Sequence, residues 1–255
     1  MSSIFRQFTT REKLILAGLY LSKYDSLGLK KLGFETFTEA YNVLGYAMGS
    51  RPASIKNYRD EFDPLFPNSR KGWHKRPLRE YCRSVFEEYK SLDLDSFTGL
   101  VKSFLGYDQN LWSEFEPLES SDEDDSRFAN RLITGLAAER YFESIQPDLP
   151  EFQDFQLENT TLLGCGYDFR LRRAAADEDF LAVEVKGLKD RTGSLSLTPK
   201  EHKAAAALMD RFFLVVVKNF QESPYHEVFQ NPLSGTLRFK KSERVIVQVS
   251  WSTSV

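Results

Sequence analysis

Three charged side chains in the second half of the chain have the types and the spacing that metal-dependent hydrolysis requires. Asp168 lies in the segment GYDFR, and Glu184 and Lys186 lie in the segment VEVKG. Both segments alternate polar and apolar residues, which is typical of β-strands, because successive side chains of a strand point to opposite faces. As two neighbouring strands, they would place Asp168, Glu184 and Lys186 on one polar face and the apolar residues on the other.

The spacing of the two segments also predicts how they pair. An antiparallel hairpin centred near Ala176 places Asp168 directly opposite Glu184. Directly opposite side chains begin about 4.5–5.5 Å apart, and two carboxylates at that distance repel each other unless a cation lies between them. An oxygen-ligated divalent ion solves this conflict. We therefore expect a Mg²⁺ site, in which Mn²⁺ can substitute.

These groups suit the hydrolysis of a phosphodiester, which needs an activated water and relief of negative charge on the phosphate. A Mg²⁺ held by Asp168 and Glu184 polarises the phosphate and lowers the pKa of a bound water. Lys186 can orient that water or stabilise the developing charge. A structural alternative remains open, in which Glu184 and Lys186 form an exposed charge pair of little energetic value.

The order of these motifs resembles the catalytic hairpin of the PD-(D/E)xK, or restriction-endonuclease-like, nuclease superfamily. The run LTPKEH at 197–202, an Ala-rich helix and the apolar segment 211–217 narrow the resemblance. They resemble the nuclease-like domain at the end of plant NO VEIN proteins and in some bacterial restriction systems. The resemblance covers roughly residues 127–220, and it departs from many relatives in having Gly166 where they have proline.

The resemblance implies roles for individual residues. Asp168 and Glu184, with Val185 between the two motif residues, would bind the metal, and Lys186 would assist hydrolysis. A further glutamate on the first core helix would correspond to Glu139, although a glutamate on a helix surface is also common. Glu201 has a structural explanation, because the run Thr198-Pro199-Lys200-Glu201 is a capping-box pattern at a helix start.

The chain divides into three parts by composition. Residues 1–115 have a helical pattern, residues 116–125 form an acidic stretch that is expected to be a linker, and residues 126–255 mix helix and strand patterns. The expected fold is mixed α/β, with a helical DNA-binding domain followed by a nuclease core whose central mixed sheet is flanked by helices. The expected helices are 13–21 (capped by Thr10), 36–47, 53–62, 77–89, 126–143 and one from Thr198, and the expected strands are 166–171, 181–185, 212–217 and 245–251.

The segment 51–59 is predicted to be the recognition helix of a helix-turn-helix, because it follows a short break after another helix. Arg51, Ser54 and Asn57 are expected to meet base edges, whereas Lys56 and Arg59 suit phosphates. The alternative is a solvated polar helix face.

The segment 69–76 is the most basic stretch of the chain and contains an aromatic residue. We expect it to clamp phosphates or to probe a groove, and the alternative is an exposed basic loop. The residues that would act are Arg70, Lys71, Trp73, His74, Lys75 and Arg76.

Composition excludes several classes of protein. The net charge of −3 argues against a highly basic nucleic-acid coat protein. Cys82 and Cys165 are too few for a disulfide framework, and no signal peptide, membrane span, zinc-site spacing or nucleotide-binding motif is present. We therefore expect a cytoplasmic protein that has no membrane partner.

These observations together predict a type II-like restriction endonuclease that cuts double-stranded DNA with Mg²⁺. A double-strand cut needs two active sites, so a homodimer is expected, and a cognate DNA methyltransferase would belong to the same system. Two alternatives stay open. One is a modification-dependent nuclease whose N-terminal half senses a methylated base, and the other is a DNA-binding protein whose nuclease-like fold is inactive.

Overall fold

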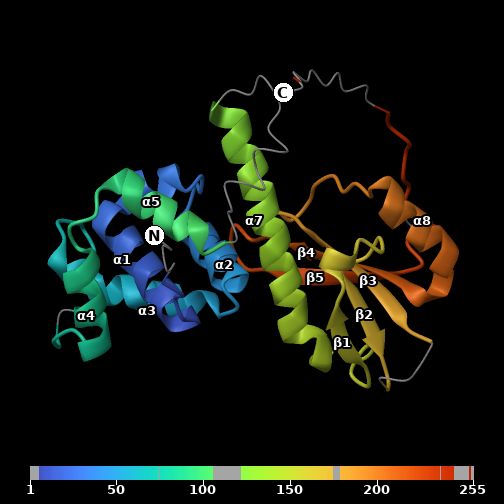
Figure 1. Ribbon diagram of the computed structural model, residues 1–255, viewed down its shortest axis with the longest axis horizontal. Helices are drawn as coiled ribbons and strands as arrows, with labels where there is room; N and C mark the ends of the chain where they lie inside the picture. Colours follow the sequence, from blue (N-terminus) through green and yellow to red (C-terminus); the bar gives the residue numbers. More distant parts are fainter. Residues whose placement is uncertain are drawn as a thin grey trace.

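The computed structural model describes residues 6–73, 75–105, 122–174, 179–235, 237–243 and 253, with the backbone alone for 122–130. The chain forms a helical N-terminal part and a C-terminal part in which helices flank a β-sheet (Figure 1). This arrangement confirms the mixed α/β fold class. No helix among these residues is long and apolar enough to cross a membrane.

The N-terminal part is built from helices that the sequence largely predicts. Thr9 caps the first helix through a capping box with Glu12, so the cap is Thr9 and not Thr10. The last helix of this part among the described residues was not predicted, although Asp93 caps it by accepting a hydrogen bond from the backbone N–H of Ser96. The helices are α1 (Thr10–Lys31), α2 (Phe37–Ala47), α3 (Pro52–Phe62), α4 (Glu80–Tyr89) and α5 (Leu94–Ser103).

The C-terminal part begins with a long helix, α7 (Asp122–Ile145). It starts before Ser126, so residues 122–125 of the expected linker are helical instead, and the rest of that linker lies outside the described residues. The expected late strand 245–251 also lies outside them.

A five-stranded sheet follows α7, with the strands in chain order. The first three strands form an antiparallel meander, the third and fourth pair in parallel, and the fifth returns antiparallel. The parallel pair is joined by a crossover through α8 (Pro199–Leu208), as a parallel connection requires. The strands are β1 (Gln156–Asn159), β2 (Phe169–Arg172), β3 (Leu181–Gly187), β4 (Phe212–Lys218) and β5 (Tyr225–Gln230).

Both faces of the sheet are covered. Phe169, Val183 and Phe213 belong to the large core that includes residues of α7. On the opposite face, Ala205 of α8 packs with Tyr167, Ala182 and Phe212 in a second apolar cluster. The prediction of one apolar and one polar face is therefore wrong, because the crossover helix covers the face that carries Glu184.

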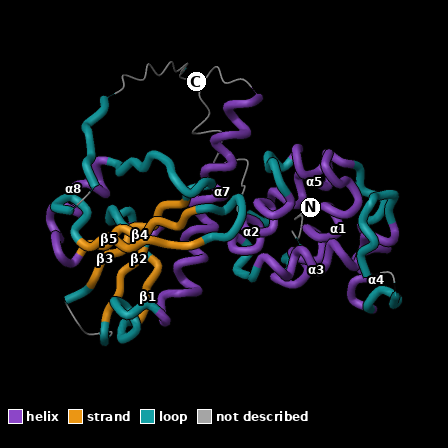
Figure 2. The backbone as a smooth tube through the Cα atoms, turned by 180° about the vertical axis from the view of Figure 1, so that it is seen from behind, coloured by secondary structure: helices purple, strands orange, loops and turns teal. Residues whose placement is uncertain are grey.

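The two halves of the chain share a single hydrophobic core, and α2 packs against α7 (Figure 2). The rings of Tyr46 and Tyr141 meet edge to face with centroids 5.1 Å apart. Asn42 donates a hydrogen bond from Nδ2 to the backbone carbonyl oxygen of Phe220 at 2.8 Å. Lys189, just beyond β3, pairs with Glu35 at 2.8 Å, so polar contacts tie α2 and the turn before it to the sheet.

Candidate active site

The hairpin of β2 and β3 has the register that the sequence predicts. Phe169 pairs with Val183 and Leu171 pairs with Leu181, so Asp168 lies beside Glu184 one residue further along. The backbone N–H of Asp168 donates to the carbonyl oxygen of Val183 at 3.0 Å. The centre of the hairpin, 175–178, lies outside the described residues.

The turn before Asp168 is fixed by close packing against α8. Gly166 has a φ of +88°, and a Cβ at this position would come within 2.6 Å of the carbonyl oxygen of Lys200. Glycine is therefore required for both its conformation and its lack of a side chain. Because the chain turns here, Tyr167 packs on the α8 side of the sheet instead of sharing the face of Phe169, as strand alternation had predicted.

Asp168 is also tied to the next strand. Its Oδ2 oxygen accepts a hydrogen bond from the backbone N–H of Val185 at 2.8 Å. The N–H and C=O of one strand residue point to the same side, so the carbonyl oxygen of Val185 also faces the Asp168 side of β3. The carboxylates of Asp168 and Glu184 and the backbone carbonyl of Val185 therefore lie near one another at this end of the hairpin.

Glu184 and Lys186 form the polar centre of the site. Glu184 is 2% exposed, and its Oε1 oxygen lies 2.5 Å from Lys186 Nζ. Lys186 Nζ also lies 3.0 Å from Oε2 of Glu201 on the first turn of α8. Lys186 is thus held between two carboxylates, and the exposed-pair alternative for Glu184 and Lys186 does not describe this arrangement.

Burial shapes the electrostatics of these groups. It raises the pKa of Glu184, and the neighbouring Asp168 charge raises it further. Burial also raises the pKa of Asp168, partly opposed by the hydrogen bond from Val185. For Lys186, burial lowers the pKa, but Glu184 and Glu201 outweigh it and the net pKa is raised. The site therefore gathers the carboxyl groups of Asp168, Glu184 and Glu201 around a single lysine.

Glu139 approaches the site from α7. Burial raises its pKa to about 7, with Asp168 as the next cause and Lys186 acting in the opposite direction. The neighbouring residue Ala138 packs against the end of β3, where a Cβ at Gly187 would lie 3.1 Å from the Ala138 Cβ. The structure therefore brings Asp168, Glu184 and Lys186 together, and α7 carries Glu139 beside the strand that holds Glu184 and Lys186.

The donors present fit a hard divalent cation that keeps part of its hydration. Within the described ranges, no three Asp, Glu, His or Cys side chains converge closely enough to enclose a metal ion. Mg²⁺, however, is usually bound through one or two carboxylates, with waters and substrate phosphates completing its shell. Asp168, Glu184 and the carbonyl of Val185 supply such a partial set.

The residues proposed to bind DNA on α3 fall into two groups. Arg51, Lys56 and Asn57 are exposed, and Ser54 is half-buried and accepts a hydrogen bond from Ser50 Oγ at 3.1 Å. Arg59 is 8% exposed and bonds Asp60 Oδ1 at 2.8 Å. Arg59 is thus occupied within the helical part and is not presented to a phosphate.

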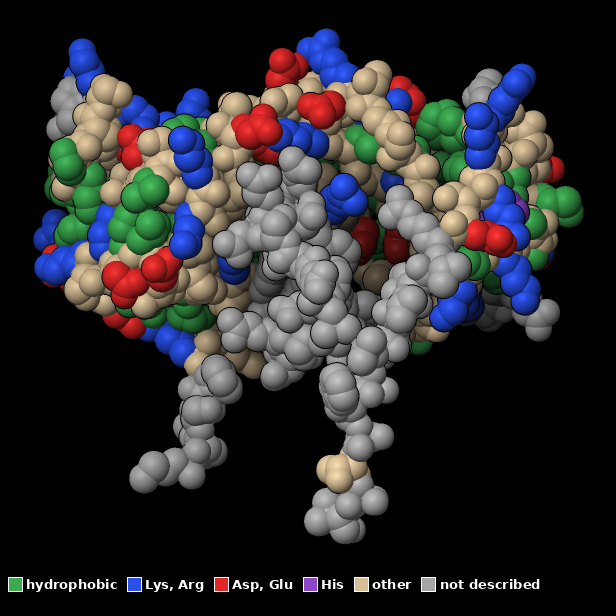
Figure 3. All heavy atoms as spheres, turned by 90° about the horizontal axis from the view of Figure 1, so that it is seen from above, with side chains coloured by type: hydrophobic (Ala, Val, Ile, Leu, Met, Phe, Trp, Pro, Cys, Tyr) green, Lys and Arg blue, Asp and Glu red, His purple; other side chains and the backbone are tan. Residues whose placement is uncertain are grey.

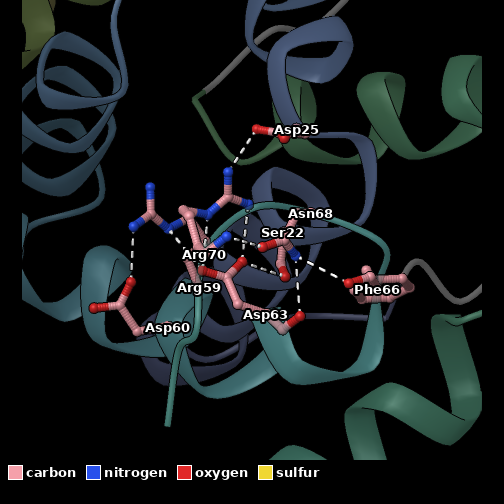
Figure 4. A network of polar contacts seen from close by, with 8 residues as sticks. All are labelled: Ser22, Asp25, Arg59, Asp60, Asp63, Phe66, Asn68 and Arg70. Carbon is pink, nitrogen blue, oxygen red and sulfur yellow. Dashed lines mark hydrogen bonds and ion pairs between the residues drawn. The ribbon is translucent and has the colours of Figure 1, made fainter. Parts of the chain in front are cut away.

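Arg70 is similarly occupied, in the polar network drawn in Figure 4. Its Nε and Nη2 atoms bond the two oxygens of Asp63 at 2.8 and 2.9 Å, and Nη1 bonds Asp25 at 2.7 Å. Asp63 is fully buried and also accepts a hydrogen bond from Ser22 Oγ at 2.8 Å. Arg70 therefore anchors the basic segment to α1 and to the end of α3.

The rest of the basic segment is more accessible. Lys71 and Lys75 are exposed, and the Arg76 guanidinium lies 4.7 Å from the ring centroid of Trp73. Gly72, Trp73, Lys75 and Arg76 line an open pocket, whereas His74 lies outside the described residues. Figure 3 shows Lys and Arg side chains spread across the molecule, with acidic side chains in a recess near its middle.

Sequence reasoning missed the contact of Glu201 with Lys186. It predicted the capping box, which is confirmed: Thr198 Oγ1 accepts from the N–H of Glu201, and Glu201 accepts from the N–H of Thr198. The order of the elements could have revealed the contact. A strand, a capped helix and a second, parallel strand follow one another, and this connection brings the first turn of α8 back to the polar end of β3.

Part of the C-terminal half matches a known protein family. A family model described as "Protein NO VEIN, C-terminal" matches residues 146–230. No curated protein and no solved structure matches the chain. The matched segment includes the whole sheet, whereas Glu139 and the helical N-terminal part lie outside it. The segment that carries Asp168, Glu184 and Lys186 is therefore similar to the C-terminal domain of NO VEIN proteins.

Proposed function

We propose that this chain is a metal-dependent endonuclease that hydrolyses phosphodiester bonds in double-stranded DNA, as a type II-like restriction enzyme does. The observation that carries the proposal is the group of Asp168, Glu184 and Lys186, in which the buried Glu184 and the half-buried Lys186 approach to 2.5 Å beside the Asp168 turn. The match to the NO VEIN C-terminal model over residues 146–230 adds weight.

The cation site would be formed by Asp168, Glu184 and the carbonyl of Val185. Mg²⁺ bound there, with Mn²⁺ as a substitute, would polarise the scissile phosphate and supply an activated water. The half-buried Asp168 and the buried Glu184 both have raised pKa values, so protons and a cation would compete for their carboxylates. This excess of acidic groups is what a site for a divalent ion needs.

Lys186 carries the positive charge that faces the reaction. Its ammonium group is held by carboxylates on two elements, so its direction is fixed before DNA arrives. A preorganised cation can stabilise charge on the phosphate oxygens without a reorganisation cost during the reaction. Glu139, with a pKa near neutrality, is suited to accept or hold a proton at the α7 side of the site.

The helical part would bring DNA to this site. Exposed residues of α3 and of the basic segment remain suited to base edges and phosphates: Arg51, Lys56, Asn57, Lys71, Lys75 and Arg76. A homodimer would supply the two active sites of a double-strand cut, and a cognate DNA methyltransferase would protect the host sites.

The deciding experiment incubates the purified chain with methylated and unmethylated plasmid, in Mg²⁺ or in EDTA. Lys186→Ala is compared with Lys218→Ala, which removes another partly buried lysine, one that pairs with Glu227 at 2.6 Å on β5. Discrete fragments that need Mg²⁺, persist in Lys218→Ala and vanish in Lys186→Ala would support the proposal. Cleavage of methylated plasmid alone would identify a modification-dependent enzyme, and tight DNA binding with no cleavage in any lane would refute the nuclease.

A further inference from the structure

We propose that Glu201 is a positioning residue that holds Lys186 in its working orientation, in addition to capping α8. This inference rests on the proposed function. One oxygen of Glu201, Oε2, accepts a hydrogen bond from the backbone N–H of Thr198 at 2.9 Å and lies 3.0 Å from Lys186 Nζ. A single carboxylate thus links the start of α8 to the ammonium group in the site.

Capping alone does not account for this contact. The first helix has the same kind of capping box, formed by Thr9 and Glu12, and the only cation that contacts Glu12 within the described residues is Arg6. That pair is solvent-accessible, with side chains 48% and 29% exposed. The Lys186 and Glu201 side chains are 23% and 15% exposed. A capping glutamate can therefore function without a half-buried lysine, and the contact at Glu201 needs a separate explanation.

The two carboxylates around Lys186 have different duties in the proposed reaction. Glu184 is also a candidate ligand of the divalent cation, so its charge is shared when the site is loaded. Glu201 then remains as the protein carboxylate dedicated to Lys186. Because charge-assisted hydrogen bonds are short and directional, this contact would hold the ammonium group in one direction while Glu184 binds the cation.

The first turn of α8 is well placed for this duty because it is anchored on two sides. Ala205 packs against the sheet with Ala182 and Phe212. At the helix start, the backbone of Gly166 is pressed against the carbonyl of Lys200, directly before Glu201. The same packing therefore fixes Glu201 and the turn that leads to Asp168, so Lys186 and Asp168 are positioned by a common support.

The test uses Glu201→Gln in the full chain, with Glu12→Gln as a matched control. Glutamine keeps an oxygen that can accept from the backbone of the cap residue, as the capping box allows, but it removes the charge that holds lysine. We expect Glu201→Gln to lower kcat for plasmid cleavage by about 10- to 100-fold, the usual effect of removing an orienting partner. KM, Tm and Ca²⁺ affinity by calorimetry should stay near wild type, and Glu12→Gln should cleave normally.

Other outcomes would overturn the inference. Unchanged kcat in Glu201→Gln, or a loss of Tm that parallels the loss of activity, would show that Glu201 only caps α8 and does not position Lys186. Loss of Ca²⁺ affinity would make it a metal ligand instead.

A second readout does not depend on cleavage. The NMR order parameter of the Lys186 ε-methylene, assigned with Lys186→Ala, should fall in Glu201→Gln and remain unchanged in Glu12→Gln. Failure of the wild-type chain to cut any DNA would count against the proposed nuclease, whereas an unchanged order parameter would count against Glu201 as the positioning residue.

Discussion

The backbone N–H of Val185 donates a hydrogen bond to the Oδ2 oxygen of Asp168 at 2.8 Å. The two residues lie on different sides of a hairpin, so this bond fixes the direction of the Asp168 carboxylate relative to β3. Val185 contributes its side chain to the core beneath the sheet and its backbone to the site. Packing of the core therefore controls the geometry of the chemical groups.

Asp168→Asn separates this geometric role from the charge. Asparagine retains an oxygen that accepts from Val185, but it cannot serve as an anionic ligand. We expect Mg²⁺-dependent cleavage to fall by at least about 100-fold, because metal polarisation of a phosphate is worth several kcal/mol. Tm should be unchanged or higher, since a half-buried acidic group with a raised pKa has been replaced by a neutral one. Cleavage near the wild-type rate in a plasmid assay would exclude Asp168 as a metal ligand.

The raised pKa of Glu139 predicts that the free energy of unfolding depends on pH when EDTA keeps the site free of metal. Its folded-state pKa of about 7 lies above the ordinary value of 4.5, so the folded protein holds this proton more tightly than the unfolded chain does. The contribution of Glu139 to the free energy of unfolding is fully present below pH 4.5. It is lost as the pH rises to about 7, the pKa in the folded protein. Glu139→Gln should therefore be more stable than wild type at pH 8, by up to about 3 kcal/mol. Urea unfolding at pH 5 and pH 8 measures this gain, which should shrink at the lower pH; an equal effect at both values would contradict it.

Binding of a divalent ion should release protons. The raised pKa values of Glu184 and Asp168 mean that protons compete with the ion for these carboxylates. Calorimetric titration with Ca²⁺ should therefore show tighter binding at pH 8.5 than at pH 6.5, with heats that depend on the ionisation enthalpy of the buffer. Glu184→Gln should abolish the binding. An affinity that does not change with pH would show that these groups do not bind the ion.

Arg70 and Lys71 are adjacent in sequence but should respond differently to truncation. Arg70→Ala leaves the buried Asp63 without its bidentate partner, and we expect the free energy of unfolding to fall by about 3 kcal/mol or more. Lys71→Ala removes an exposed charge, so stability should hold while DNA affinity falls equally for all sequences. The slope of the logarithm of DNA affinity against the logarithm of salt concentration should decrease in magnitude by about one, as expected for the loss of one phosphate contact.

Thermal unfolding and fluorescence anisotropy at several salt concentrations measure these effects. If the Arg70→Ala variant keeps its full stability but binds DNA more weakly, then Arg70 contacts a phosphate and is not a structural anchor.

The hairpin and its register were predictable because they follow from local alternation and the distance between two motifs. Burial of the Glu184 face was not, since it depends on α8 returning across the sheet. The same limit applies to Glu201, whose helix cap is visible in four adjacent residues, whereas its contact with Lys186 needs the three-dimensional arrangement.

The roles of the basic residues were harder to predict for a related reason. Arg59 and Arg70 have the sequence context of phosphate contacts, but their acidic partners come from the kink of α1 and the end of α3. Strands β1 and β5 were missed because polar residues interrupt any apolar alternation in them, and their side chains are exposed or half-exposed. Local periodicity is weakest for such edge strands.

The packing of α2 on α7 has a consequence for how such a protein can change its target. The helix that carries Glu139 on the site side also receives the helical half of the chain. A new N-terminal half could not simply be exchanged for the old one, since it would need a face that matches Tyr141 and the loop at Phe220. The sequences of the DNA-recognising half and the cutting half would therefore have to change together. Engineering of a new specificity is better directed at the exposed residues of α3 than at replacement of the whole N-terminal half.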